Sequence, residues 1–390
     1  MVVTADPLSE PPPLSLYVHL PWCVRKCPYC DFNSYTAGDD APREQYVSAL
    51  LTDIDAEAER GVGRPLVSIF LGGGTPSFFT PAQIATVLGR IEDRFVLGAD
   101  IEITMEANPG TVESGDPAGY RQAGVNRLSI GAQSFSAASL ALLGRIHNVE
   151  DIERSVTEAR AAGFDNINID IMHGLPGQSV AAAIFDIEQA DRLGPSHLSW
   201  YQLTLEPNTV FHSRPPAGLP DDEALSEIQE AGQARLADLG FEQYEVSAYA
   251  RGGRRSVHNL NYWRFGDYLA VGAGAHGKIS SADGIWRYTK PANPRQYISD
   301  LSGGAGSAEL KPVSAEELVF EFMLNAVRLT TGFDEQLFVG RTGLRVDILR
   351  TGLAGAVEKG LIARTGAAFW QVTPLGRRFL NDLQAEFLPA

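Results

Sequence analysis

Residues 20–32, LPWCVRKCPYCDF, contain all three cysteines of a chain of 390 residues. Cys23, Cys27 and Cys30 follow the spacing Cys-x3-Cys-x2-Cys, directly after a short β-rich run at 15–18. Thiolates hold iron–sulfur clusters, which normally take four of them. Three cysteines on one loop therefore predict a cluster with one open iron, where a substrate or cofactor can chelate.

Two other interpretations of these cysteines stay open from the residues alone. A zinc site needs a fourth ligand, which His19 or a distant histidine would supply. Three incidental core cysteines would need no site, but a spaced cysteine cluster is a strong metal-site signal. The odd number of cysteines argues against a disulfide framework and suits a reducing compartment.

The start of the chain and its charge narrow the class of protein. MVVTADPLSEPPPLS has acids and prolines where a secretory signal has a basic and then an apolar run, and no 18-residue apolar stretch occurs. We therefore expect a cytoplasmic protein. The net charge of −16 argues against a nucleic-acid partner, because phosphate binding requires clustered lysine and arginine.

Short β-rich runs alternate with longer helical patterns from Ser15 onward. The helical spacing of Val47, Leu50, Leu51, Ile54 and Ala58 is typical of the helices between them. Such alternation predicts an α/β protein with a parallel sheet covered by helices. Six β/α units are fewer than the eight of a closed barrel, so we expect a partial (β/α)6 barrel. The candidate strands are SLYV (15–18), VSIFL (67–71), IEITM (101–105), RLSI (127–130), INIDI (167–171) and HLSWYQL (197–203).

Composition divides the chain into five parts. Residues 1–13 predict a flexible N-terminal tail, 14–240 the barrel, 241–302 a segment that caps the barrel mouth, and 303–313 a linker. Residues 314–390 predict a smaller, helical, winged-helix-like domain whose first helix begins at Ser314. Its eight Lys and Arg against nine Asp and Glu favour a packing or partner role over DNA binding.

Polar residues follow successive predicted strands at their ends. The second strand runs into the glycine-rich loop FLGGGTPS, and Glu106, Gln133 and Asp170 lie at or near the ends of the next three. Loops at this end of a barrel gather the active site. Arg145, in LLGRIHN, is suited to pair a carboxylate. The set predicts a site that binds a ribose and a carboxylate near the cysteines.

The cysteine loop after the first strand, with Tyr29 before the last cysteine, resembles the cluster loop of radical S-adenosylmethionine (SAM) enzymes. The resemblance implies a [4Fe-4S] cluster whose open iron takes the amino and carboxylate groups of SAM. The loop at 72–77 resembles the element that hydrogen-bonds the methionine amino group. The reduced cluster of that superfamily passes an electron to the sulfonium of SAM.

The order SLYVHLPWC, CPYCDF, GGGTPS, RLSIGAQSF, NIDIMHGLPGQ and GAGAHG resembles the HemN/HemW group of this superfamily, over nearly the whole chain from Ser15. That group contains oxygen-independent coproporphyrinogen III oxidase and its relative, the HemW heme chaperone. The resemblance implies SAM contacts at Tyr17, Gly73, Gly74, Thr75, Glu106, Gln133, Arg145 and Asp170.

Two features separate the branches of the group. First, the oxidases carry a further cysteine two positions after the third one, and this chain has Phe32 there. Second, HNLNYW at 258–263 matches the His-Asn-x-x-Tyr-Trp motif of HemW. The match implies heme binding: His258 would ligate the iron, while Tyr262 and Trp263 would offer flat apolar faces. An ordinary aromatic cluster with a hydrogen-bonded histidine is the alternative, and His276 in GAGAHG is a second candidate ligand.

We therefore expect a heme chaperone that binds a [4Fe-4S] cluster, SAM and heme, and that lacks coproporphyrinogen oxidase activity. The oxidase is the main alternative. A radical-type RNA-modifying enzyme is disfavoured by the acidic charge. The resemblance implies heme-accepting partner proteins, with membrane-associated respiratory hemoproteins as candidates, and leaves homodimer formation open.

Overall fold

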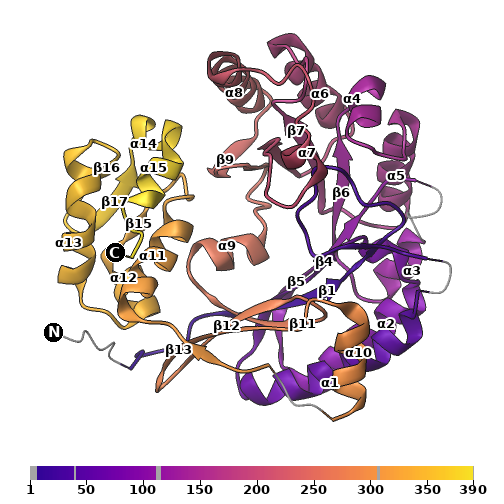
Figure 1. Cartoon of the computed structure of the whole chain (residues 1–390), viewed down its shortest axis with the longest axis horizontal. Helices are drawn as coiled ribbons and strands as arrows, with labels where there is room; N and C mark the ends of the chain where they lie inside the picture. Colours follow the sequence, from indigo (N-terminus) through magenta and orange to yellow (C-terminus); the bar gives the residue numbers. More distant parts are fainter. Residues whose placement is uncertain (1–6, 39–40, 111–115, 305–307, 390) are drawn as a thin grey trace.

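The computed structural model of the chain describes residues 7–38, 41–110, 116–304 and 308–389 (Figure 1). Within these residues the main sheet has twelve strands, in the order β14-β13-β12-β11-β1-β4-β5-β6-β7-β8-β10-β9. The predicted strands are all present as parallel neighbours, which confirms the α/β partial barrel. They are β1 (Leu14–Leu20), β4 (Leu66–Gly73), β5 (Leu97–Ala107), β6 (Arg127–Gln133), β7 (Ile167–His173) and β8 (His197–Gln202).

Helices follow these strands and cover the outer face of the curved sheet (Figure 1). The longer ones are α1 (Arg43–Arg60), α2 (Pro81–Arg94), α5 (Val149–Ala161), α6 (Val180–Arg192) and α8 (Asp222–Asp238). Shorter elements lie in the loops: β2 (Trp22–Cys23), β3 (Tyr35–Thr36), η1 (Pro76–Phe78), α3 (Pro117–Gln122), α4 (Ala137–Leu142) and α7 (Val210–Ser213).

Alternation along each strand separates an aliphatic outer face from a polar inner face. In β1, Leu16 and Val18 are buried in the core that contains Leu50 and Ile54 of α1. Successive side chains of a strand point to opposite faces. The intervening residues of β1, Ser15, Tyr17 and His19, therefore face the interior of the barrel, as do Glu106 of β5 and Asp170 of β7 in the pocket they line.

The segment 241–302, expected to cap the barrel, extends the sheet at both edges. Its elements are β9 (Glu242–Glu245), β10 (Ala248–Ala250), α9 (Val257–Trp263), β11 (Asp267–Val271), β12 (His276–Ser281), β13 (Gly284–Thr289) and α10 (Pro294–Ser302). Strand β10 pairs with β8, whereas β11 pairs in parallel with β1. Helix α9 connects these two edges and contacts β1, β4 and β11.

The structure describes only part of the predicted linker and of the predicted tail. Lys311–Pro312 form β14, which pairs with β13, so this part of the expected linker belongs to the sheet. Residues 305–307 of the linker and 1–6 of the tail lie outside the described residues, and residues 7–13 contain no helix or strand.

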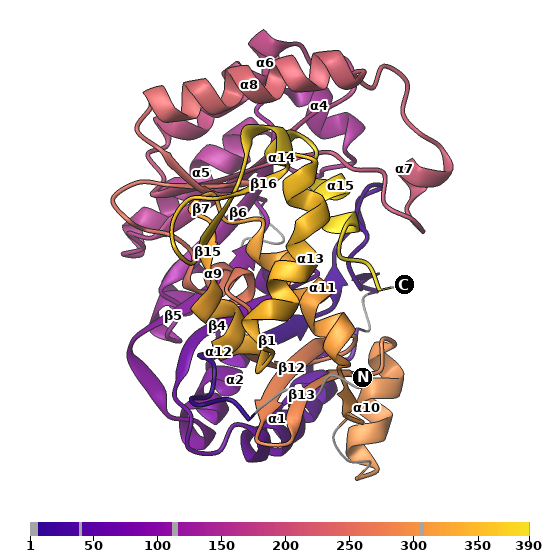
Figure 2. The same cartoon turned by 90° about the vertical axis from the view of Figure 1, so that its left-hand side faces the viewer.

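The C-terminal part has a hydrophobic core of its own, which includes Phe322, Phe338 and Leu353. Ser314 caps α11 (Ala315–Ala326) and pairs reciprocally with Glu317, as the predicted helix start requires. Its other elements are β15 (Phe333–Asp334), α12 (Glu335–Thr342), α13 (Val346–Glu358), β16 (Ile362–Arg364), β17 (Phe369–Val372), α14 (Pro374–Arg378) and α15 (Leu380–Ala385). This unit lies in front of the sheet in Figure 2, and α11 contacts α9. No helix among the described residues is both long and apolar enough to cross a membrane.

Candidate functional site

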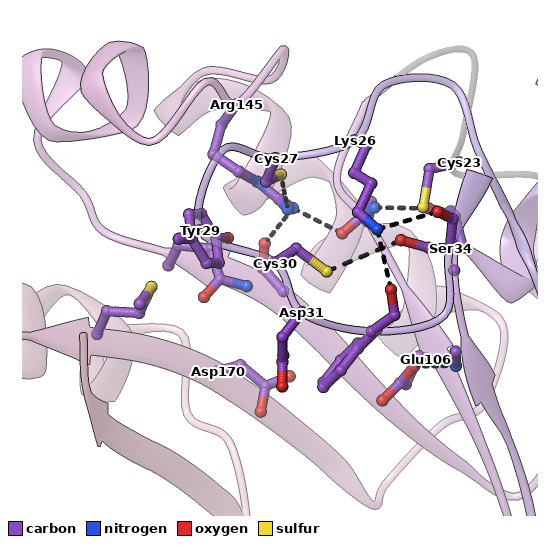
Figure 3. A pocket seen from close by; sticks show the side chains of 18 of the residues that line it. Cys23, Lys26, Cys27, Tyr29, Cys30, Asp31, Ser34, Glu106, Arg145 and Asp170 are labelled. Atoms are coloured by element: carbon purple, nitrogen blue, oxygen red, sulfur yellow. Dashed lines mark hydrogen bonds between the residues drawn. The ribbon is translucent and has the colours of Figure 1, made fainter. Parts of the chain in front are cut away.

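The three cysteines line one cavity of about 390 Å³, which the ends of the parallel strands form together with the cysteine loop (Figure 3). Cys23 ends β2, and the loop from Cys23 returns through β3, which pairs with β2. The ammonium of Lys26 donates to the carbonyls of Phe32 and Ser34, at 3.0 and 3.1 Å. The loop is therefore closed by its own hydrogen bonds around the three thiols.

The surroundings of the thiols favour a cluster over a single zinc ion. Both ring nitrogens of His19 are bonded, one to the Tyr17 hydroxyl (3.0 Å) and the other to the Asn33 carbonyl (2.9 Å), so this histidine is not free as a fourth ligand. Among the described residues, no three His, Cys, Asp or Glu side chains converge closely enough to hold one metal ion. With His19 bonded elsewhere, the loop offers three thiols, the number that would leave one iron of a [4Fe-4S] cluster open.

Close contact with the cysteine loop requires the glycines that follow β4. A Cβ on Gly74 would lie 2.7 Å from the backbone of Pro21 and Trp22, and Gly73 has a φ of 116°. Only glycine adopts this backbone without strain. The Gly73 amide donates to Glu106 Oε2 at 3.0 Å, which ties the glycine loop to the end of β5.

Two partly buried carboxylates, Glu106 and Asp170, stand in the cavity below the cysteine loop (Figure 3). Burial raises the pKa of Glu106 from 4.5 to about 7; the Gly73 hydrogen bond opposes this rise and the charge of Asp170 adds to it. Burial also raises the pKa of Asp170, against the hydrogen bonds it accepts. Asp170 accepts from Ser129 and Asn168, both at 2.8 Å. A cationic ligand group would relieve the charge repulsion of this pair.

Arg145 joins the cysteine loop to the strand ends. It donates to Cys27 Sγ (3.5 Å), Asn108 Oδ1 (2.6 Å) and the Gly131 carbonyl (2.9 Å). Burial alone would lower the pKa of Arg145, but nearby Tyr29 and Cys27 outweigh it and raise the pKa. The guanidinium thus stays charged and faces a cavity that suits an anionic group.

Seven of the eight expected SAM contacts line this first cavity. They are Gly73, Gly74, Thr75, Glu106, Gln133, Arg145 and Asp170. Tyr17 instead lines a neighbouring cavity. Sequence reasoning missed Asn108, which bonds both Thr75 and Arg145, and Tyr201, which donates to Gln133 Oε1 at 2.6 Å. Both follow or end a barrel strand, so the same strand-end rule would have found them.

A second cavity, of about 690 Å³, adjoins the first on the side of α9 and the C-terminal unit. The two share Asp31, Phe32, Gly73 and Glu106. Aromatic and basic side chains line the second cavity, among them Tyr17, Tyr262, Trp263, Tyr268, His276 and Arg287. We call this cavity the aromatic chamber, although charged side chains, among them Asp31, Glu106 and Lys278, also line it.

His258 does not face either cavity, although it belongs to HNLNYW. Its side chain is only 2% exposed; Nδ1 lies 2.9 Å from Ser68 Oγ and Nε2 lies 3.0 Å from the Tyr262 hydroxyl. Burial, with Arg127 adding to it, lowers the pKa of His258 to about 3, so the ring is neutral. In this arrangement Tyr262 and Trp263 line the chamber, whereas the expected iron ligand lies behind Tyr262.

The sequence matches two families that cover most of the chain. Residues 17–190 match the Radical SAM superfamily, and residues 313–379 match the HemN C-terminal domain. The heme chaperone HemW of Escherichia coli (strain K12) is 48% identical over 378 residues, 97% of this chain and 98% of that protein. Heme chaperone HemW of Haemophilus influenzae is 46% identical over 97% of this chain and 98% of that protein.

Two further similar proteins are more distant in sequence. The mitochondrial radical S-adenosyl methionine domain-containing protein 1 of Bos taurus is 37% identical over 83% of this chain and 74% of its own. The solved structure of coproporphyrinogen III oxidase (HemN) from Escherichia coli, a radical SAM enzyme, has a TM-score of 0.80. It covers 97% of this chain and 90% of its own at 24% identity, which shows a shared fold.

Proposed function

The chain belongs to the HemW family of radical SAM proteins, and from this premise we propose that it is a heme chaperone that delivers heme to acceptor hemoproteins. One observation supports the proposal above the others: a cavity with three thiols shares a wall with an aromatic chamber. A protein with this pair of cavities can hold a cluster and its cofactor beside a porphyrin. Residence in the cytoplasm and the identity of the acceptors stay predictions.

In the first cavity, Cys23, Cys27 and Cys30 would hold a [4Fe-4S] cluster. A reduced cluster supplies a single electron for SAM bound at its open iron. Glu106 and the glycine loop, joined by the hydrogen bond from the Gly73 amide to Glu106, would accept hydrogen bonds from the amino group of SAM. Arg145 would pair the carboxylate, and Asp170, held by Ser129 and Asn168, would bind the ribose hydroxyls.

In the second cavity, heme would lie against the faces of Tyr262 and Trp263. The volume of about 690 Å³ lies within the range of binding sites for ligands of this class. Each Å² of apolar ring surface removed from water contributes about 25 cal/mol, so burial against Tyr262 and Trp263 would favour heme binding.

Oxygen-independent coproporphyrinogen III oxidase is the second candidate, because the fold is shared. Phe32 occupies the position of the oxidases' further cysteine and is 54% exposed at the boundary of the two cavities. The phenyl ring of Phe32 provides no thiol at the position where a substrate of the oxidase would bind. The chaperone is therefore the proposed function and the oxidase its competitor.

One parallel assay separates the two activities. Protein reconstituted anaerobically with iron and sulfide is tested for heme binding, for heme transfer to an apo-hemoprotein, and for conversion of coproporphyrinogen III in the presence of SAM and a reductant. We expect heme binding and transfer without turnover. Robust formation of protoporphyrinogen, or no heme binding by the wild type, would overturn the proposal.

A further inference from the structure

We infer that His276, not His258, is the side chain that ligates heme iron in the aromatic chamber, and that His258 is a positioning residue for Tyr262. The inference rests on the proposed function and deepens it. It concerns which side chain binds the heme iron, so it can be wrong even if the protein binds heme.

His276 has the geometry of a ligand. It is the first residue of β12, is exposed, and lines the second cavity. Its Nδ1 lies 3.0 Å from the hydroxyl of Thr289, its partner in the β12–β13 register. In the described part of the chain, Nε2 has no hydrogen-bond partner. Metal-bound histidines typically fix one ring nitrogen by such a bond and present the other to the metal.

His258 has the geometry of a support. Ser68 and Tyr262 bond its two ring nitrogens, at 2.9 and 3.0 Å, and its ring stacks on Phe70 with centroids 4.9 Å apart. Ligation would require breaking one of these bonds and moving Tyr262 out of the way. Tyr262 also packs edge-on against Tyr268, at 4.4 Å between centroids. Together these contacts hold the Tyr262 ring as a fixed wall of the chamber.

The strand that carries Thr289 also places a cation on the same wall. Arg287 lies two residues earlier on β13, hence on the same face as Thr289, and lines the cavity. Its side chain is 28% exposed and pairs with Glu321 at 2.6 Å, whereas Lys278 is buried against Asp267. Because its guanidinium nitrogens already donate to Glu321 and to the Tyr268 hydroxyl, Arg287 would contribute positive charge to this wall rather than a free donor for a propionate group.

The test is a titration of the full-length protein with ferric heme, followed by difference absorbance and electron paramagnetic resonance, in wild type, His276→Ala, His258→Ala and His212→Ala. His212, on α7, lines neither cavity and serves as the control. We expect His276→Ala to lose the histidine-ligated spectrum and regain it with added imidazole. His258→Ala should keep that spectrum with affinity reduced by about tenfold, as for loss of a supporting contact.

Each other outcome is decisive. If His258→Ala loses the signature and imidazole restores it, while His276→Ala keeps it, the assignment is reversed. If both variants keep the wild-type spectrum, the ligand is another residue and the inference fails although the proposed function stands. If both lose it, imidazole rescue of His276→Ala alone supports the inference, and rescue of His258→Ala alone overturns it. A wild type that binds no heme removes the proposed function and the inference together.

Discussion

At the scale of single residues, Glu106 makes the proposed SAM site sensitive to pH. Burial raises its pKa from 4.5 to about 7, so the carboxyl is largely protonated below neutrality. The carboxylate is a stronger acceptor than the protonated carboxyl for the N–H groups of the iron-bound amino group of SAM, because the acceptor is then charged. Raising the pH through 7 should therefore strengthen SAM binding, with affinity at pH 6 about tenfold below its plateau at pH 8.

Equilibrium titration of the cluster-loaded protein with SAM between pH 6 and 8 measures this dependence. Glu106→Gln keeps the shape but removes the titrating group, so its affinity should be low and nearly constant with pH. A wild-type affinity that does not change over this range would show that Glu106 does not contact the amino group. An unchanged slope in Glu106→Gln would assign the pH dependence to another group.

Residue types and spacing predicted the first cavity better than the second. Glu106, Gln133 and Asp170 were found because strand ends of a barrel meet at one edge, and the structure brings them into the cavity of the cysteines. For His258, the spacing in the sequence already indicated a contact with Tyr262. His258 and Tyr262 are four residues apart on α9, so the spacing predicts a contact between them; in the structure His258 Nε2 lies 3.0 Å from the Tyr262 hydroxyl, which occupies that nitrogen.

At the scale of elements, the loop between β2 and β3 presents three cysteine thiols and no fourth ligand from His19. Removing any one of Cys23, Cys27 or Cys30 leaves two thiolates, which hold a four-iron cluster poorly. We expect each Cys→Ala variant to lose the iron and the broad visible absorbance of the wild type after anaerobic reconstitution. Iron and sulfide analysis gives the measurement, and zinc at one equivalent without iron in the wild type would contradict it.

Helix α9 depends on one buried carboxylate at its N-terminus. Glu102 of β5 accepts hydrogen bonds from the amides of Val257 and His258, both at 3.1 Å, and lies 3.9 Å from Arg127. Replacing it leaves Arg127 as a buried charge without its partner, which typically costs 3–5 kcal/mol. We expect Glu102→Ala to lower the free energy of unfolding by roughly 3 kcal/mol or more.

Urea unfolding of the cluster-free protein, followed by circular dichroism, tests this estimate. Glu153, exposed on α5, supplies the control, since surface substitutions usually change stability by less than about 0.5 kcal/mol. Equal midpoints for Glu102→Ala and Glu153→Ala would mean that α9 does not depend on this carboxylate.

The length and periodicity of an element determine whether the sequence could predict it. The barrel strands β1, β4 and β5 stand out because each is a β-rich run next to a helix of clear period. Strands β9 and β10 have only four and three residues, and glycines lie within β12 and at the start of β13, so the periodic signal in this segment is weak. Their partners are also far away in sequence: β11 pairs with β1, and β10 with β8. Such pairing is a property of the folded chain.

At the scale of the whole molecule, the second cavity is assembled from distant parts of the chain. Tyr17 comes from β1, Tyr262 from α9, His276 from β12 and Asn325 from α11 of the C-terminal unit. Glu321 of α11 fixes this unit to β13 through Arg287, and Arg328 pairs with Glu245 of β9 on the other edge of the sheet. The C-terminal unit therefore completes the chamber, a role that its composition alone did not reveal.

The shared wall predicts that the two cavities are coupled. Phe32, 54% exposed, and Glu106 line both, and Lys26 of the cysteine loop bonds the Phe32 carbonyl at 3.0 Å. SAM bound in the first cavity would neutralise the charge of Glu106 and order the Phe32 segment against the chamber. Both effects favour an anionic, aromatic ligand such as heme, so we expect heme to bind about fivefold more tightly with SAM present.

Heme titrations of the cluster-loaded protein with and without SAM measure the coupling, and SAM titrations with and without heme must give the same factor, because linkage between two binding sites is reciprocal. Phe32→Ala should reduce the factor toward one while each ligand still binds alone. Val62→Ala, at an exposed position between α1 and β4, should leave it unchanged. If heme affinity is the same with and without SAM in the wild type, the shared wall transmits nothing and the two cavities act independently. A factor that survives in Phe32→Ala would leave Glu106, the other shared side chain that responds to SAM, as the group that carries the coupling.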